Sequence, residues 1–580
     1  MSALLVAAID FGTTYSGWAF SFEHEYERDP TKVFAKNWSG GQLVSQKGPT
    51  CVLIHPDGKR LHSFGYEAES KYGELALDKR HKQWFFFKRF KMSLYGRIGI
   101  ERNIMLEDAS GKKLTAKTVF ALSIKYLKDD LIKMSEKRLA GAGIRNYSIH
   151  WVLTVPAIWN DAAKQFMREA AQDAGILKEN LTIALEPEAA SLFCRHLPVE
   201  KCLGREKISL SKFKAGTKYL VLDAGGGTVD ITVHEVMSNG DLRELHKASG
   251  GAWGGTKVDD AFENFLTVVI GKKAVENFKQ HHMEDYIDIF RDFEIKKRET
   301  APSKDSKITI RVPVSLVEMA KKTNGKPMKQ SISKSMFKEK LSLIGDKIRM
   351  EANVMKGFFY LPLKSILDHV GKLLSEPQIY GCSAIVMVGG FSESTILQEH
   401  IQNMFSDLKI VIPEEAGLAV LKGAVIFGHN PKMIAERVCK YTYGTDITHV
   451  ASPMCKHHRK NTRPDEYGEM RCYGIFEKHA KIGQSIRIGE QQKECLSWPM
   501  YDDQTSVTYD IYASSSVDPV FVTDVGCSRI GTLTIPISDT SLGRERRFGV
   551  SFLFGGTEIE VKVVDKTTGE VTIKTVDFLG

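Results

Sequence analysis

Two turns in this sequence combine residue types that can hold a nucleotide phosphate. Residues 10–14 (DFGTT) and residues 223–228 (DAGGGT) each place an Asp, glycines and Thr directly after an apolar run. Glycines let backbone amides approach a phosphate closely, Thr hydroxyls add hydrogen bonds, and a carboxylate at a strand end can hold hydrated magnesium. Both turns are therefore candidates for a phosphate and Mg²⁺ site, although a lone Asp-x-Gly-Thr turn is more often structural.

A third glycine turn strengthens this interpretation. Gly389 and Gly390 follow the apolar run 384–388 (AIVMV), where a flat adenine or ribose can pack against bare backbone. None of the three turns has the GxxxxGK[ST] pattern of a P-loop or the GxGxxG of a dinucleotide-binding turn. The three turns together favour a nucleotide held between two lobes.

The elements that position these turns indicate an α/β fold. Residues 6–14 and 219–228 form an internal repeat of apolar strand, Asp, glycine and Thr, which predicts two related lobes. The continuous apolar strands are typical of sheets covered by helices on both faces. Between them, residues 149–155 predict a strand and residues 162–174 (AAKQFMREAAQDA) a helix that stops at Gly175.

Composition indicates a cytoplasmic globular protein of several domains or subdomains. The 580 residues are too many for one core, and 42% hydrophobic with 26% charged residues argues against disorder. The net charge of +9 is a small excess of 80 basic over 71 acidic side chains, so nucleic-acid binding is not indicated. The nine cysteines form no CxxC pair, and no apolar run is long enough to span a bilayer.

The sequence texture changes near Pro431, where helical periodicity gives way to short β-rich runs. We therefore predict one domain over residues 1–430 and a β-rich domain over residues 431–580. Strict alternation in residues 558–564 and 571–576 predicts a hairpin of half-buried strands.

These segments resemble the 70-kDa heat-shock protein family, within the actin, heat-shock and sugar-kinase ATPase superfamily. The resemblance covers roughly residues 3–430 and rests on six segments, residues 10–15 (DFGTTY), 154–161 (TVPAIWND), 185–190 (LEPEAA), 223–230 (DAGGGTVD), 250–259 (GGAWGGTKVD) and 389–392 (GGFS). With its charged insertion at residues 197–217 and its β domain, the full chain is most similar to the atypical 12A/12B branch. The resemblance implies an actin-like ATPase domain of two ribonuclease H-like folds, followed by a sandwich-like domain without a helical lid.

The resemblance also implies roles for individual residues. Asp10 and Asp223 would organise Mg²⁺, and Glu186 would position the attacking water. Lys88 would be the catalytic lysine, with an exposed basic loop as the alternative. Contacts to ATP or ADP are implied for Gly12, Thr13, Thr14, Tyr15, Gly225, Gly226, Gly227, Thr228, Gly254, Gly255, Glu294, Lys297, Arg298, Gly389, Gly390 and Ser392. For the helical residues among them, a solvated helix face is the alternative.

Three functions follow as hypotheses. The first is a slowly ATP-hydrolysing, chaperone-like protein whose β domain binds unfolded or specific client polypeptides, with nucleotide-exchange or co-chaperone partners. The second is a nucleotide-switched adaptor, favoured because no Asp-flanked hydrophobic linker is recognisable around residues 431–445 and no lid follows the hairpin. A sugar kinase is the third, and the C-terminal hairpin argues against it.

The family's ribose-contacting Asp has no match in residues 413–424, which predicts weaker nucleotide affinity.

Overall fold

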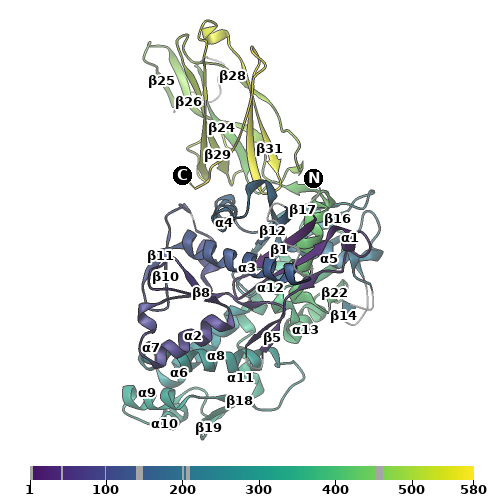
Figure 1. The fold of residues 1–580 in the computed structure, drawn as a ribbon. Coiled ribbons are helices and arrows are strands. Elements are labelled where there is room, and N and C mark those ends of the chain that lie inside the picture. The colour runs from purple at the N-terminus through teal and green to yellow at the C-terminus, as the bar shows by residue number, and fades with distance from the viewer. Residues whose placement is uncertain are drawn as a thin grey trace.

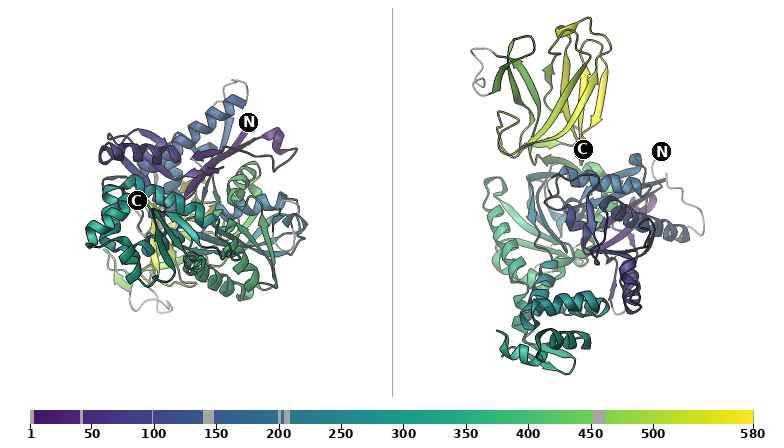
Figure 2. Two further views of the ribbon diagram at one scale, coloured as in Figure 1. Left: turned by 90° about the horizontal axis from the view of Figure 1, so that it is seen from below. Right: turned by 90° about the vertical axis from the view of Figure 1, so that its left-hand side faces the viewer.

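The computed structural model describes residues 4–40, 43–97, 99–138, 148–198, 202–203, 209–451 and 461–579. Two α/β lobes form the larger part, and a β-sandwich stands on one end of them (Figures 1 and 2). Within these ranges, no helix is both long enough and apolar enough to cross a membrane.

Lobe I is built on a mostly buried central sheet. Strand β1 (Leu5–Phe11) pairs parallel with β12 (Ile149–Val155) and antiparallel with β2 (Tyr15–Phe22). Alternate residues of β1 pack against two different cores, one with α3 (Ala116–Arg138) and α4 (Asp161–Asp173), the other with α14 (Ala419–His429). Every residue of β1 is buried because helices cover both faces of the sheet.

Lobe II repeats this arrangement. Strand β15 (Lys218–Ala224) pairs parallel with β21 (Cys382–Val388) and antiparallel with β16 (Val229–Val236). The sheet continues through β17 (Leu242–Gly251) on one side and β22 (Lys409–Pro413) on the other. The repeat in the sequence is therefore a repeat of the strand, turn, strand unit at the centre of each lobe.

Two helices lie between the lobe sheets in direct contact, α5 (Glu186–His196) and α14. A Cβ on Gly423 of α14 would lie 1.7 Å from the carbonyl oxygen of Ala189 in α5, so only glycine permits this approach. Farther out, α2 (Tyr66–Leu77) packs against α8 (Met283–Arg298) through a small apolar cluster. The two lobes are thus joined at the base and touch again at the opposite side of the cleft.

The remaining described strands and helices extend these lobes. They are α1 (Glu23–Tyr26), β3 (Phe34–Ala35), β4 (Trp38–Gly40), β5 (Leu43–Ser45), β6 (Gly48–Pro49), β7 (Cys51–Ile54), β8 (Leu61–Phe64), β9 (Phe85–Lys88), β10 (Met105–Glu107), β11 (Lys113–Thr115), β13 (Leu181–Leu185), β14 (Cys202–Leu203), α6 (Thr256–Ile270), α7 (Lys272–His281), β18 (Ile308–Arg311), α9 (Val314–Asn324), α10 (Met328–Lys334), β19 (Leu341–Ile344), β20 (Lys347–Met350), α11 (Ala352–Gly357), α12 (Tyr360–Leu374) and α13 (Thr395–Met404).

The C-terminal domain is made of two antiparallel sheets. One has the order β25-β26-β24-β29-β30 and the other β28-β31-β32-β33. Their bounds are β24 (Thr442–Val450), β25 (Thr462–Pro464), β26 (Met470–Ala480), β28 (Cys495–Ser497), β29 (Ser506–Ser514), β30 (Cys527–Pro536), β31 (Phe548–Gly555), β32 (Glu558–Asp565) and β33 (Val571–Thr575). The inner faces share one apolar core that includes Val507, Ile511, Phe552 and Val561.

The junction between the domains lies slightly beyond Pro431. Strand β23 (Ile434–Val438) pairs with β17 and β27 (Ser485–Arg487), so it extends the lobe II sheet, and the sandwich sheets start with β24. The predicted boundary therefore falls just before a strand that still belongs to the lobe II sheet.

The sandwich is docked on α4 of lobe I, as Figure 1 shows. Arg168 of α4 pairs with Glu558 at 2.7 Å, and the Tyr443 hydroxyl donates to Asp161 at 3.0 Å. Asp577 accepts hydrogen bonds from Arg102 and Gln165, and Leu579 packs into the lobe I core. Polar contacts and one apolar anchor thus fix the sandwich on the lobe.

Candidate nucleotide site

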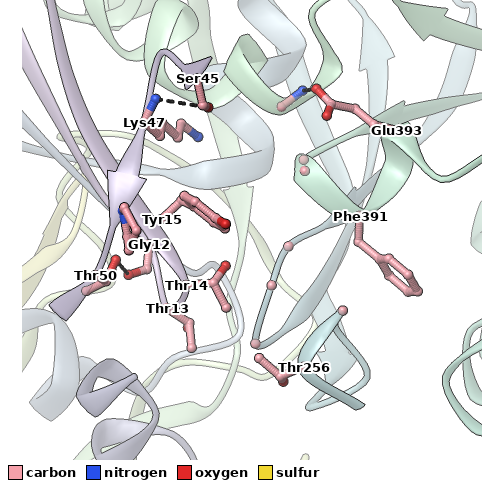
Figure 3. A pocket seen from close by; sticks show the side chains of 18 of the residues that line it. Gly12, Thr13, Thr14, Tyr15, Ser45, Lys47, Thr50, Thr256, Phe391 and Glu393 are labelled. Carbon is pink, nitrogen blue, oxygen red and sulfur yellow. Dashed lines mark hydrogen bonds between the residues drawn. The ribbon is translucent and has the colours of Figure 1, made fainter. Parts of the chain in front are cut away.

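A cavity of about 610 Å³ lies between the lobes, and its lining draws on both. This volume is within the range of small-molecule and cofactor sites. The β1–β2 turn reaches it from lobe I and the β15–β16 turn from lobe II. Figure 3 shows Thr13, Thr14 and Tyr15 on one side, with Thr256, Phe391 and Glu393 on the opposite side.

The two glycine turns face each other at very short range. A Cβ on Gly226 would lie 2.0 Å from the Thr14 hydroxyl, and one on Gly227 would lie 2.5 Å from the Thr13 hydroxyl. A Cβ on Gly12 would lie 2.1 Å from the Tyr15 carbonyl oxygen. Side chains are therefore excluded, and both turns present bare backbone to the cavity, which suits an anionic ligand.

Carboxyl groups gather beneath these turns, from Asp10, Glu186, Asp223 and Asp230. Burial and the carboxylates of Glu186 and Asp230 raise the pKa of Asp223 well above its usual value. Burial also raises the pKa of Glu186 to about 7, against the opposing effect of Lys91. Burial favours a higher pKa for Asp10 as well, but the Lys47 and Lys91 ammonium groups outweigh it and hold the pKa of Asp10 below its usual value.

Asp223 is buried, yet among the described residues no hydrogen bond or ion pair reaches its carboxylate. An unpaired buried carboxyl group is costly, and the cluster has more carboxylates than nearby cations. Hard oxygen ligands with excess negative charge suit a divalent cation such as Mg²⁺. The donor set on the Asp223 side therefore fits a magnesium site.

The predicted catalytic lysine, Lys88, lines the cavity wall and is paired there with Glu69, which also lines the cavity, instead of with Glu186. Its ammonium group lies 2.9 Å from Glu69, and 38% of its side chain is exposed. Lys91, three residues later, is buried and lies 2.7 Å from Glu186. No sequence pattern distinguishes Lys91, because three basic residues occur within four positions of the segment FKRFK.

The local backbone explains which of these cations turns inward. Strand β9 ends at Lys88, and Arg89 has a φ of 56°, a left-handed conformation that redirects the chain into the short 3₁₀ helix Phe90–Leu94. Lys91 on this turn then points to the centre, where its ammonium group lies 5.2 Å from the centre of the Trp159 ring. The apolar residues Phe87, Phe90 and Leu94, which are buried, have the three- and four-residue spacing of a helical turn, and this spacing is the sequence signal for the reversal.

Helix α8 supplies the charged wall farther from the turns. Lys297 pairs with Glu294 at 2.6 Å and with Asp259 at 2.7 Å, and the Arg298 guanidinium lies 5.2 Å from the centre of the Tyr15 ring. All three predicted helical residues line the cavity. They therefore form a fixed network on the cavity wall instead of a solvated helix face.

The third glycine turn lies at the end of β21. Gly389 has a φ of 86°, and a Cβ there would clash with Asp223 at 2.3 Å, while Gly390 faces open space. Both line the cavity together with Gly255. Gly254 and Ser392, which were also predicted to contact the nucleotide, do not line the cavity. Gly254 packs under the second turn, where an added Cβ would lie 2.5 Å from the Gly226 carbonyl oxygen, and Ser392 is fully buried.

Two lobes with duplicated sheets around such a cavity define an actin-like nucleotide-binding domain of mixed α/β content. The model of the Hsp70 protein family matches residues 89–446, more than half of the chain. Heat shock 70 kDa protein 12A from Mus musculus is 33% identical over 99% of this chain and 92% of its own length. The chain belongs to the Hsp70 family, which confirms the predicted membership.

Other relatives place the chain within the family. Heat shock 70 kDa protein 12B from Homo sapiens is 32% identical over 99% of this chain and 91% of its own length. Chaperone protein DnaK from Thermotoga maritima is 27% identical, over 66% of this chain and 56% of its own length. The similarity to the 12A and 12B proteins thus includes the C-terminal sandwich, as expected from the predicted similarity of the full chain to the 12A/12B branch.

Proposed function

We propose that this chain binds ATP and ADP with Mg²⁺ in the cavity, hydrolyses ATP slowly, and uses the nucleotide state to control polypeptide binding by its β domain. The observation that carries the proposal is the pair of glycine turns that face each other above buried carboxylates. Their bare backbone amides and the hydroxyls of Thr13, Thr14 and Thr228 would hold the phosphates. The wall made by Gly389, Gly390 and Arg298 would hold the adenosine.

Asp10 and Asp223 are the residues that would hold Mg²⁺, which when bound neutralises charge on the phosphates. Among the residues that the structure describes, no hydrogen bond or ion pair reaches the carboxylate of Asp223, which lies near the end of β15. On the opposite side of the cluster, Thr154 donates to Asp10 at 2.8 Å and fixes the orientation of that carboxylate.

For hydrolysis, we assign Glu186 to orient the attacking water and Lys91 to the role expected of Lys88. The ammonium of Lys91 holds Glu186 at the N-terminus of α5, and phosphoryl transfer depends mainly on such positioning and on electrostatics. Because the Glu186 carboxylate has a pKa of about 7, part of the population is protonated near neutral pH. This supports a slow ATPase.

The contacts between the domains offer a route from the nucleotide to the β domain. Lys440, which precedes the first sandwich strand, donates to the carbonyl oxygen of Trp159 at 3.2 Å, and the Trp159 ring lies beside Lys91. Asp230 accepts the Ile158 amide at 2.9 Å in the same segment. A change around Lys91 therefore reaches the junction through two residues, which supports coupling between the sites.

The test compares nucleotide binding and hydrolysis in wild type and Asp223→Ala. We expect Asp223→Ala to abolish measurable binding of Mg-ATP in calorimetric titration, with Asp407→Ala, an exposed carboxylate outside the cavity, as the control. Hydrolysis is then measured with and without an unfolded polypeptide, such as reduced α-lactalbumin. Unchanged binding in Asp223→Ala would refute the site assignment.

An adaptor with little chaperone activity is the second candidate. It is favoured because the described residues 461–579 contain strands and one short 3₁₀ helix, with no long helix over the sandwich. Nucleotide binding without any effect of unfolded polypeptide on turnover would support the adaptor and contradict the chaperone function.

A further inference from the structure

One lysine lies on the carboxylate that the proposed function assigns to magnesium. Lys47 follows β5 and precedes β6, and its ammonium group lies 2.5 Å from Oδ2 of Asp10. The other oxygen of Asp10 accepts the Thr154 hydroxyl at 2.8 Å. Both oxygens of Asp10 therefore have protein donors, whereas Asp223 has none among the described residues.

The fold holds Lys47 at this position through the neighbouring backbone. Gly48 pairs with Ser16, and the Thr50 hydroxyl donates to the Gly12 carbonyl oxygen at 2.7 Å. The segment that carries Lys47 is therefore attached directly to the first glycine turn. Figure 3 shows Lys47 and Thr50 on the same side of the cavity as Gly12.

A glycine in β2 makes room for the lysine. Gly17 is the residue opposite Asp10 in the β1–β2 pair. A Cβ on Gly17 would lie 2.9 Å from the Gln46 carbonyl oxygen and 3.1 Å from Cγ of Lys47. Any larger residue at this position would displace the lysine stem from Asp10.

Charge considerations indicate what this lysine does. Among the described residues, two ammonium groups form ion pairs with the buried carboxyl cluster, Lys91 with Glu186 and Lys47 with Asp10. Lys47 is thus the cation that balances Asp10, at the point where the phosphates and a divalent ion would meet. A charge-assisted bond of this kind in a buried site stabilises the carboxylate strongly.

We propose that Lys47 acts as an internal cation in the phosphate site, competing with the divalent ion for Asp10 and making ADP binding only weakly dependent on Mg²⁺. This inference rests on the proposed nucleotide site and adds a role for Lys47 in how binding there depends on Mg²⁺. Lysine suits the role because its compact charge sits on a flexible stem that can follow the phosphates.

The experiment measures ADP affinity by calorimetric titration in Mg²⁺ and in EDTA, for wild type, Lys47→Met and Lys47→Arg. We expect the wild-type Kd to change by less than about threefold between the two conditions. In Lys47→Met, EDTA should weaken binding by about tenfold to a hundredfold, the effect of losing one buried charge-assisted contact. Lys47→Arg keeps the charge and should retain most of the EDTA-resistant binding, and Lys59→Met, an exposed lysine, serves as control.

A second readout uses Mn²⁺ in place of Mg²⁺, without nucleotide. Removing the competing ammonium should increase Mn²⁺ affinity in Lys47→Met, measured by electron paramagnetic resonance. Wild type that binds ADP in Mg²⁺ but loses it in EDTA would refute this inference and leave the nucleotide site standing. Wild type that binds ADP under neither condition would refute both. If Lys47→Met does not fold, the comparison of wild-type ADP affinity in Mg²⁺ and in EDTA still tests the inference.

Discussion

Glu244 is the buried carboxyl group whose titration we expect to control attachment of the strand that leads into the β domain. It lies on β17, is 6% exposed, and accepts the Val438 amide of β23 at 2.8 Å. Burial and the nearby Glu188 raise its pKa to about 8, although the Val438 amide and Arg437 oppose the shift. The folded protein therefore keeps Glu244 protonated at neutral pH.

The sign and size of the pH effect follow from the difference between folded and unfolded states. In the unfolded chain Glu244 ionises near its usual pKa of 4.5, whereas the folded state holds the proton up to about pH 8. The stability contributed by the protonated group is complete below about pH 4.5 and is lost as pH rises toward 8. The slope is about 1.4 kcal/mol per pH unit, so the loss from about pH 5.5 to about pH 7.5 is about 3 kcal/mol.

Glu244→Gln tests this reasoning because glutamine keeps the acceptor for Val438 and cannot ionise. We expect the variant to lack the slope, so that its free energy of unfolding exceeds that of wild type increasingly between pH 5.5 and 8. Urea unfolding gives the difference at each pH, and hydrogen exchange of the Val438 amide reports the local effect. Glu436→Gln, on β23 itself, should retain the wild-type slope. Equal pH dependence in wild type and Glu244→Gln would refute the assignment.

Two further predictions concern the catalytic lysine and domain docking. Lys91→Met should lower ATP turnover by about a hundredfold, because Glu186 loses its partner. Lys88→Met should keep turnover within about threefold of wild type in the same steady-state phosphate-release assay. Equal losses of turnover in both variants would contradict the assignment of Lys91. Asp577→Ala removes the partially exposed carboxylate that binds Arg102, so it should weaken docking of the sandwich by about 1 kcal/mol or less and increase the radius of gyration in X-ray scattering. An unchanged scattering profile and unchanged proteolysis between the domains would show that this contact does not hold the sandwich in place.

The sequence alone determined the features that depend on local backbone preference. The strands before Asp10 and Asp223 could be located because a short continuous apolar run that ends at a glycine turn is typical of a buried strand. The hairpin of β32 and β33 could likewise be predicted from its alternation. Buried and half-buried residues alternate along β32, whereas β33 is mostly exposed because it lies at the edge of its sheet. Family membership followed from the same segments.

Only the tertiary structure decided which charged side chains enter the cavity. Lys47 reaches Asp10 across 37 residues and Lys91 reaches Glu186 across 95, and no local pattern distinguishes either from the other lysines of the chain. The choice depends on the left-handed turn at Arg89 and on the space beside Gly17, which exist only when the strands are paired. A buried charge is tolerated where an oppositely charged side chain from elsewhere in the chain lies next to it, and only the tertiary fold brings two such side chains together.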